Sequence, residues 1–210
     1  MPTFLFIRHG DNDYLAHNKL PGHLPDIHIN ERGRLQATEL ERTLNGLPIK
    51  AVYSSPLERA METATPMAHS LKLEVQPCPD LIDIDVGDWA GRSWKALRRT
   101  KQWKVIQETP SQFQFPSGES FAQVQERVVV ALDSIAAVHQ DELIAVVFHA
   151  DPIKLAVAHY LGLPLDHFQR LTVFTGSVTI LNVNGSAVTL LALNLNPPFS
   201  FPIGKKIKKG

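Results

Sequence analysis

The stretch TFLFIRHG, residues 3–10, is the part of the chain that decides its fold. Its first six residues form a short apolar run that ends in a charge, which is typical of a buried β-strand over Thr3–Arg8. The run is far shorter than the roughly 18 apolar residues of a membrane span, and it lacks the basic and cleavage regions of a signal peptide. His9 is therefore expected to stand directly after the first strand.

Downstream of this strand, helical and strand-like runs alternate, which is typical of a mainly parallel sheet covered on both faces. Further strands are expected at 51–54 and 143–148, and helices at 31–45, from 55 to about 72, at 120–139 and at 151–161. Short β-prone runs fill 171–193, with a hairpin turn at Asn184-Gly185. The predicted fold class is α/β, a three-layer α/β/α sandwich with a mainly parallel central sheet and a small helical cap.

Local patterns give finer predictions for the helices. Leu35, Leu40 and Leu44 are expected on the buried side of the first helix. The segment SPLE, residues 55–58, combines a capping-box pattern with proline at the first helical position. Residues from about 77 to 118 resemble an excursion from the core, with one short basic helix at 93–103. The tryptophans of this excursion are expected to pack in the core or cap.

Bulk properties limit the partners that the protein is expected to have. The 210 residues suit a single domain over 1–200, and the formal net charge of zero argues against a nucleic-acid or membrane partner. The only basic run, at 201–210, is expected to be a solvated tail. Cys78 is the single cysteine, so a reducing, cytoplasmic location is expected, and no spacing around it indicates a metal. A homodimer is left open.

Three strand-to-helix junctions each carry a residue suited to phosphate. Arg8 and His9 end the first strand, Arg59 follows the second, and His149 ends the apolar strand at 143–148. Ligands of open parallel sheets bind outside the carboxyl ends of the strands, where helix N-termini favour anions. Each residue alone has an ordinary structural explanation, but together they predict an anion site. The pattern by itself does not predict a reaction.

The reaction follows from a resemblance to the histidine phosphatase superfamily, also called the phosphoglycerate mutase-like family. It covers most of the chain, and the motifs occur in the family's order. They are FIRHG at 6–10, INERGRLQA at 29–37, YSSPLERAMETA at 53–64, PSGES at 116–120 and VFH at 147–149.

The resemblance implies that the imidazole of His9 is the nucleophile that becomes phosphorylated. It also implies that Arg8 and Arg59 bind the phosphate oxygens and that His149 donates to the transferring group if it is protonated. A carboxylic acid must protonate the leaving oxygen and later activate water. The family's glutamate at this position is replaced by Asp83, which is our choice for the acid, with Asp85 as the fallback. No metal or other cofactor is expected.

Two further departures from the family pattern leave the substrate open. After the nucleophile, Asp11, Asn12 and Leu15 replace the family's Glu, Thr and Asn, and Asn12 is still able to offer its side chain to phosphate. After His149, the segment ADPIK at 150–154 replaces a glycine-rich one, and Ala90 replaces a glutamate.

The leading interpretation is a phosphatase acting on a small phosphorylated metabolite. The first alternative is a phosphoglycerate mutase-like phosphomutase, although such mutases are usually longer. The second alternative is a non-catalytic domain that binds a phosphorylated ligand.

Overall fold

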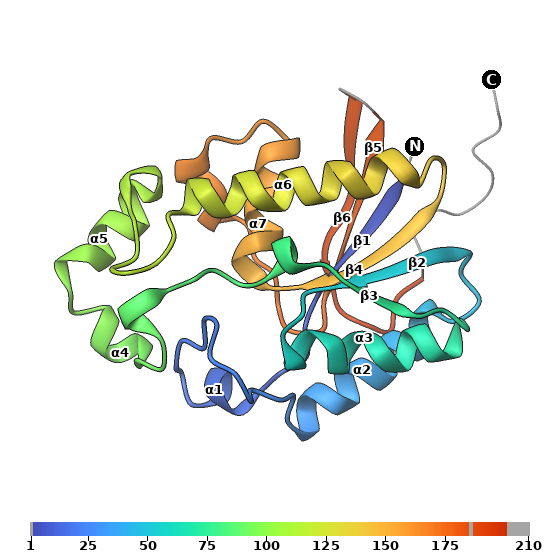
Figure 1. The fold of residues 1–210 in the computed structure, drawn as a ribbon, viewed down its shortest axis with the longest axis horizontal. Coiled ribbons are helices and arrows are strands. Elements are labelled where there is room, and N and C mark those ends of the chain that lie inside the picture. The colour runs from blue at the N-terminus through green and yellow to red at the C-terminus, as the bar shows by residue number, and fades with distance from the viewer. Residues whose placement is uncertain (1, 185–186, 201–210) are drawn as a thin grey trace.

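Six strands form the central sheet in the computed structural model, which describes residues 2–184 and 187–200 (Figure 1). The strands are β1 (Thr3–Arg8), β2 (Ile49–Ser54), β3 (Val75–Pro77), β4 (Leu143–Phe148), β5 (Val178–Asn184) and β6 (Ala187–Leu195). Their order is β3-β2-β4-β1-β5-β6. The first four strands in this order are parallel to one another, whereas β5 and β6 are antiparallel to their neighbours. The sheet is therefore mixed, with a parallel part of four strands that contains β1.

Helices cover both faces of the sheet, which confirms the predicted three layers. Alternate residues of β1 point to opposite faces, so Phe4 and Phe6 pack in one core and Leu5 and Ile7 in the other. The first core is covered by α6 (Phe121–Val138) and α7 (Ala150–Tyr160), and the second by α2 (Glu31–Leu44) and α3 (Glu58–Ser70). Figure 1 shows these two pairs on opposite sides of the strands.

The apolar strand and the longest helix lie where the sequence predicts them. Every residue of β4 is buried, and β4 lies between β1 and β2 in the middle of the parallel strands. Ser120 and Gln123 form a capping box at the start of α6, and this helix buries an apolar face. Its buried residues include Phe121, Val124, Val128, Leu132 and Ile135.

One predicted core residue of α2 is wrong. Leu40 and Leu44 are buried, but the side chain of Leu35 is 60% exposed. The buried positions of α2 are Gly33, Ala37, Leu40 and Leu44, which recur every three or four residues along the helix. Leu35 lies two residues from Gly33 and from Ala37, so it points to the opposite side of the helix.

The predicted capping box at the start of α3 is not formed. The helix begins at Glu58 with Leu57 as its N-cap, and no side chain caps it. The hydroxyl of Ser55 instead lies 2.7 Å from Nε2 of His149 and accepts a long hydrogen bond from the Leu57 N–H. Ser55 therefore contacts His149, which follows β4, rather than capping α3 with its side chain.

The excursion consists of short helices rather than the single basic helix predicted at 93–103. Its elements are η1 (Pro79–Leu81), η2 (Gly87–Trp89), α4 (Trp94–Leu97), α5 (Lys101–Glu108) and η3 (Pro110–Gln112). Ser93 caps α4 and Thr100 caps α5, so a second helix start interrupts the expected one. Figure 1 shows α4 and α5 at one end of the molecule, away from the strands.

Two short elements complete the fold, α1 (Asp13–Ala16) and η4 (Leu165–Arg170). Gly185 of the predicted hairpin turn and the basic tail at 201–210 lie outside the described residues. Within the described residues, no helix is long and apolar enough to cross a membrane.

The two leucines of α2 provide a matched pair for testing this packing. Leu40→Ala is expected to lower the free energy of unfolding by about 2–5 kcal/mol, because it removes a fully packed side chain. Leu35→Ala is expected to change it by less than about 0.5 kcal/mol, because little of this side chain leaves water on folding. Urea denaturation of both variants measures the difference, and equal losses would contradict the assigned helix face.

Candidate active site

Residues from three neighbouring parallel strands meet at the carboxyl edge of the sheet. His9 follows β1, His149 follows β4, and Arg59 lies in the first turn of α3, after β2. The register pairs Arg8 with Phe148 and Ser54 with Val147, so the three strands end at the same level. The ring centroids of His9 and His149 are 5.1 Å apart. The predicted convergence of these residues is confirmed.

The His9 ring is held in one orientation by its own loop. The side chain is 2% exposed, and Nδ1 lies 2.7 Å from the Gly10 carbonyl oxygen. Because a carbonyl only accepts, Nδ1 carries the proton and Nε2 carries the free electron pair. Burial, followed by the nearby His149 and arginines, holds the pKa of His9 well below its ordinary value. The ring is therefore a neutral imidazole with Nε2 available as a nucleophile.

Close backbone packing fixes the loop that carries His9. The N–H of Gly10 donates to the Thr63 hydroxyl at 2.9 Å, which ties the loop to α3. A Cβ on Gly10 would lie 2.8 Å from the Gly33 carbonyl oxygen, closer than real side chains come. Glycine at this position therefore lets the loop approach α2 closely enough to place the His9 ring.

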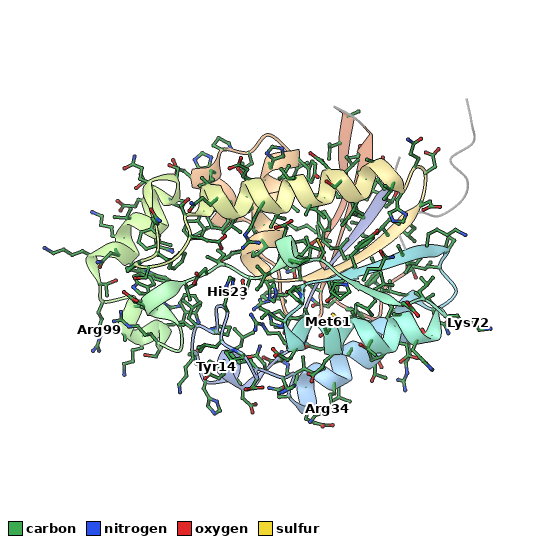
Figure 2. The ribbon with its side chains drawn as sticks, viewed as in Figure 1. Tyr14, His23, Arg34, Met61, Lys72 and Arg99 are labelled. Carbon is green, nitrogen blue, oxygen red and sulfur yellow. The ribbon has the colours of Figure 1, made fainter. Side chains whose placement is uncertain are left out.

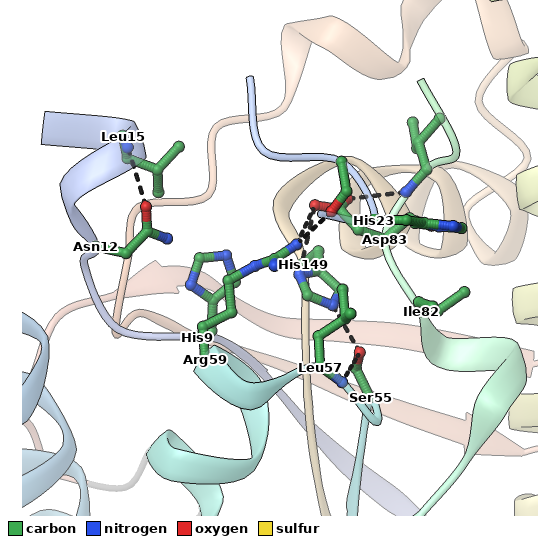
Figure 3. A network of polar contacts seen from close by, with 12 residues as sticks. His9, Asn12, Leu15, His23, Ser55, Leu57, Arg59, Ile82, Asp83 and His149 are labelled. Carbon is green, nitrogen blue, oxygen red and sulfur yellow. Dashed lines mark hydrogen bonds and ion pairs between the residues drawn. The ribbon is translucent and has the colours of Figure 1, made fainter. Parts of the chain in front are cut away.

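The guanidinium of Arg59 is fully buried between His9 and Asp83 (Figure 3). Its Nη2 donates to the Gly22 carbonyl at 2.9 Å and to Oδ2 of Asp83 at 3.0 Å. Its Nε and Nη1 have no hydrogen-bond partner in the described part of the chain. A buried guanidinium with donors left over is suited to bind a second anion.

His149 contacts both Ser55 and Asp83. Its Nε2 lies 2.7 Å from the Ser55 hydroxyl, and its Nδ1 lies 3.5 Å from Oδ2 of Asp83. Burial, followed by Arg59 and Arg8, holds the pKa of His149 well below its ordinary value. These surroundings favour a neutral ring rather than the protonated one considered from the sequence. We assign the proton to Nδ1, because the Ser55 O–H then donates to Nε2.

Of the two candidate acids, only Asp83 reaches this centre. Its Oδ1 accepts from the Ile84 N–H at 2.9 Å, which leaves Oδ2 facing Arg59 and His149 (Figure 3). Asp85 instead binds the backbone two residues further along the chain, where its Oδ1 accepts from the Gly87 N–H at 2.9 Å. The geometry favours Asp83 over the fallback Asp85.

Asn12 and Arg8 supply the remaining donors. Asn12 is fully buried, and its Oδ1 accepts from the Leu15 N–H at 3.0 Å, which leaves Nδ2 without a partner among the described residues. Arg8 donates from Nη1 to the Val173 carbonyl at 2.8 Å, and its Nε is likewise unpaired there. Burial lowers the pKa of Arg8, although Asp151, Asp83 and Asp11 oppose the effect.

Buried donors without partners therefore collect around the two histidines. In the described part of the chain, five such nitrogens belong to the predicted site residues: Arg8 Nε, Asn12 Nδ2, Arg59 Nε, Arg59 Nη1 and His149 Nδ1. Leaving a buried donor unpaired costs free energy, and a charged donor costs more. A phosphate dianion offers several acceptor oxygens and the opposite charge, so it suits this cluster.

Comparison with known proteins agrees with this geometry. The family model of the histidine phosphatase superfamily (branch 1) matches residues 4–196. The chain belongs to the histidine phosphatase superfamily.

Individual relatives cover nearly the whole chain. Phosphoserine phosphatase 1 of Hydrogenobacter thermophilus is 28% identical over 93% of this chain and 93% of its own. The 2,3-bisphosphoglycerate-dependent phosphoglycerate mutase of Thermoplasma acidophilum is 30% identical over 93% of this chain and 94% of its own. The solved structure of Bacillus stearothermophilus YhfR superposes with a TM-score of 0.86 at 26% identity, over 93% of this chain and 98% of that one.

Sequence reasoning missed the residues that hold this histidine phosphatase centre in place. Ser55 and Thr63 lie within the quoted motif at 53–64, yet nothing in the pattern indicated which partners they bind. Arg127 carries no signal in the sequence at all.

In the described residues, no cluster of three or more metal-ligating side chains is present.

Arg127 braces the backbone that carries Asp83. Its Nη2 donates to the Asp83 carbonyl at 2.8 Å, and its Nη1 donates to the carbonyls of Asp80 and Ile82. Glu119, from the PSGES motif, accepts from Nε of Arg127 at 2.8 Å. The ring of His23 also contacts the Asp83 carbonyl, and Figure 2 shows His23 near the middle of the molecule. Arg127 thus acts as a positioning residue for Asp83.

Removing this brace is expected to slow turnover without loss of the fold. In Arg127→Gln, kcat for a phosphate monoester should fall about 10- to 100-fold, because small misplacements of a reacting group are costly. The affinity for inorganic phosphate should change little, since the donors around His9 remain. Glu126→Gln, at the exposed neighbouring position, is the control. An unchanged kcat in a folded Arg127→Gln protein would contradict the positioning role.

The two buried histidines also predict how stability depends on pH. Both pKa values are lowered on folding, so below about pH 6.5 the unfolded chain binds protons that the folded one excludes. Stability should therefore fall on acidification through this range, by up to about 1.4 kcal/mol per pH unit for each ring.

Urea unfolding between about pH 7 and pH 5 measures this slope. His9→Gln and His149→Gln should each make the slope shallower. His69→Gln, which alters an exposed ring, should leave it unchanged. An equal slope in all four proteins would show that the buried rings are not responsible.

Proposed function

We propose that this histidine phosphatase hydrolyses small phosphate monoesters through a phosphoryl group carried on Nε2 of His9. The observation that carries the proposal is the set of unpaired buried donors gathered beside a neutral imidazole with a free electron pair. Arg8, Asn12, Arg59 and His149 would bind the non-bridging oxygens, which spreads the charge of the transferring group.

In the first step the electron pair of His9 Nε2 forms a bond to phosphorus as the ester P–O bond breaks. The electrons of that bond go to the leaving oxygen, which takes the proton of the Asp83 carboxyl and departs as an alcohol. Nδ1–H of His9 keeps its hydrogen bond to the Gly10 carbonyl, which stabilises the positive charge that forms on the ring.

In the second step water attacks the phosphorus of the phosphohistidine. Asp83, now a carboxylate, takes the proton from water, and the electrons of the broken P–N bond return to Nε2 of His9. Inorganic phosphate leaves, and both residues regain their starting states. Asp83 thus acts once as an acid and once as a base.

Asp83 must change partners for this cycle to run. Its Oδ2 contacts Arg59 and His149, the same groups that would bind phosphate. A phosphate dianion bound there repels the carboxylate and favours its protonated form. Substrate binding would thereby displace Asp83 from Arg59 and prepare it as the acid beside the leaving oxygen.

Relatives named as phosphatases support hydrolysis of a small molecule. The relative from Hydrogenobacter thermophilus is named a phosphoserine phosphatase, and another, from Escherichia coli, is named an adenosylcobalamin/alpha-ribazole phosphatase. The cytoplasmic location and the homodimer considered from the sequence stay predictions.

A phosphomutase is the second candidate, because the relative from Thermoplasma acidophilum is named a mutase. A mutase must hold a substrate that carries a second anionic group, and it must return the phosphoryl group to another oxygen of that substrate. Lys154, the cation next to the substrate side of Asp83, is paired with Asp151 at 2.5 Å. Because the charge of Lys154 is already compensated by Asp151, it has less to offer a second anionic group, which favours hydrolysis over isomerisation. Isomerisation that depends on a bisphosphate primer would establish the mutase instead.

Asp83→Asn separates the two steps when the leaving group is varied. With p-nitrophenyl phosphate the leaving oxygen needs no acid, so a rapid burst of one p-nitrophenol per active site is expected. Steady-state turnover should then be about 10²- to 10⁴-fold slower than in the parent protein, because water has lost its base. With ethyl phosphate, whose leaving oxygen needs the proton, no burst is expected.

Stopped-flow absorbance and phosphate release measure these phases. His9→Ala should show neither burst nor turnover, and inorganic phosphate should still bind in Asp83→Asn. Phosphate binding without turnover in the parent protein would identify a non-catalytic domain. Steady-state turnover in Asp83→Asn equal to that of the parent would refute the double role of Asp83.

A further inference from the structure

A cavity of about 160 Å³ opens beside Asp83, between the excursion and the core. Asp83 and Gly22 both line it, and both accept hydrogen bonds from Nη2 of Arg59. The cavity therefore borders the phosphate centre on the side of Asp83. An ester bound with its phosphorus at His9 and its leaving oxygen at Asp83 would place its alcohol group here.

Large apolar side chains from η2, α4, α5, α6 and the loop before α6 line the cavity. They are Trp89, Trp94, Trp103, Ile106, Phe115 and Phe121. The rings pack against one another, with Trp94 and Trp103 edge to face at 5.7 Å and Trp89 and Phe115 edge to face at 5.5 Å. The tryptophans, expected from the sequence to pack in the core or cap, also face this space.

The polar side chains of the wall already have partners. Lys154 lies 2.5 Å from Oδ1 of Asp151 and 5.3 Å from the centre of the Phe168 ring. Gln107 donates to Oε1 of Gln169 at 2.8 Å, and Gln169 donates to the Ile106 carbonyl at 3.1 Å. A charged alcohol group would have to compete with these existing pairs for the polar side chains of the wall.

The volume of the cavity limits the alcohol group of the ester as strongly as the polarity of the wall does. An engineered apolar cavity of about 150 Å³ binds benzene, and this one measures about 160 Å³. Aromatic walls favour a planar guest, because edge-to-face and offset contacts between rings add to the burial of apolar area. One six-membered ring fits such a space, and a fused pair of rings fits it less easily.

We propose that the preferred substrates are phosphate esters of small alcohols bearing a single aromatic ring, which enters the cavity walled by Trp89, Trp94 and Ile106. The proposal rests on the function proposed above and narrows it to a substrate class. Amino-acid phosphates and sugar phosphates, whose alcohol parts are charged or strongly hydrated, would be poor substrates by comparison.

Three esters with alkyl leaving oxygens test this preference: benzyl phosphate, ethyl phosphate and O-phospho-L-serine. Burial of the ring should raise kcat/KM for benzyl phosphate roughly 10- to 100-fold over ethyl phosphate. O-Phospho-L-serine should be no better than ethyl phosphate. A benzyl-to-ethyl ratio near one, or a preference for phosphoserine, would overturn the proposal. Hydrolysis of ethyl phosphate that is lost in His9→Ala reports separately on the proposed phosphatase function.

Two neighbouring positions of α5 give a matched pair of variants. Ile106 is buried in the cavity wall, whereas Val105 is 36% exposed and does not line the cavity. Ile106→Phe should fill the space and reduce the benzyl-to-ethyl ratio at least fivefold, because the aromatic ring of the ester loses its site. Val105→Phe adds a ring outside and should keep the ratio. A ratio that survives in Ile106→Phe would contradict the assigned site.

Enlarging the cavity tests the size limit even if Ile106→Phe fails to fold. The parent protein should hydrolyse 2-naphthylmethyl phosphate less efficiently than benzyl phosphate. In Trp94→Ala the order of these two esters should reverse, because the wall has lost an indole. An order that does not change would show that Trp94 does not limit the leaving group.

Discussion

The structure depends on a positive charge buried at the carboxyl edge of the sheet. The Arg59 guanidinium is inaccessible to solvent, and one carboxylate oxygen and one carbonyl accept from the single nitrogen Nη2. Removing such a charge from water is costly unless its other donors are also bound. The unpaired Nε and Nη1 of Arg59 therefore favour binding of an anion. Burial, with the charge of Arg59 as a further cause, holds the pKa values of His9 and His149 well below their ordinary value and keeps both rings neutral.

The parallel part of the sheet makes this burial possible. The strands β2, β4 and β1 end side by side, so loops distant in sequence deliver Ser55, His149 and His9 to one place. The excursion then closes the other side, where Arg127 fixes the backbone of Asp83 and the aromatic wall begins. The reactive groups thus lie at the edge of the sheet, and the excursion is proposed to select the leaving group.

Much of this arrangement follows from the sequence, because strand periodicity and five ordered motifs constrain it. The end of β1, the apolar β4 and the meeting of His9, Arg59 and His149 were all predictable. Contacts that form only in three dimensions were not, since no local pattern encodes the partner of Ser55 or of Arg127. Leu35 shows the same limit, because its apolar character suggested a burial that the helix geometry does not provide.

The most direct test of the central claim is to locate the phosphoryl group during turnover. Asp83→Asn is mixed with p-nitrophenyl phosphate, quenched in alkali to preserve phosphohistidine, digested and mapped by mass spectrometry. The account predicts one phosphoryl group per chain, on the peptide that contains His9. A phosphoryl group on His149, or p-nitrophenol released with no phosphorylated residue, would contradict it.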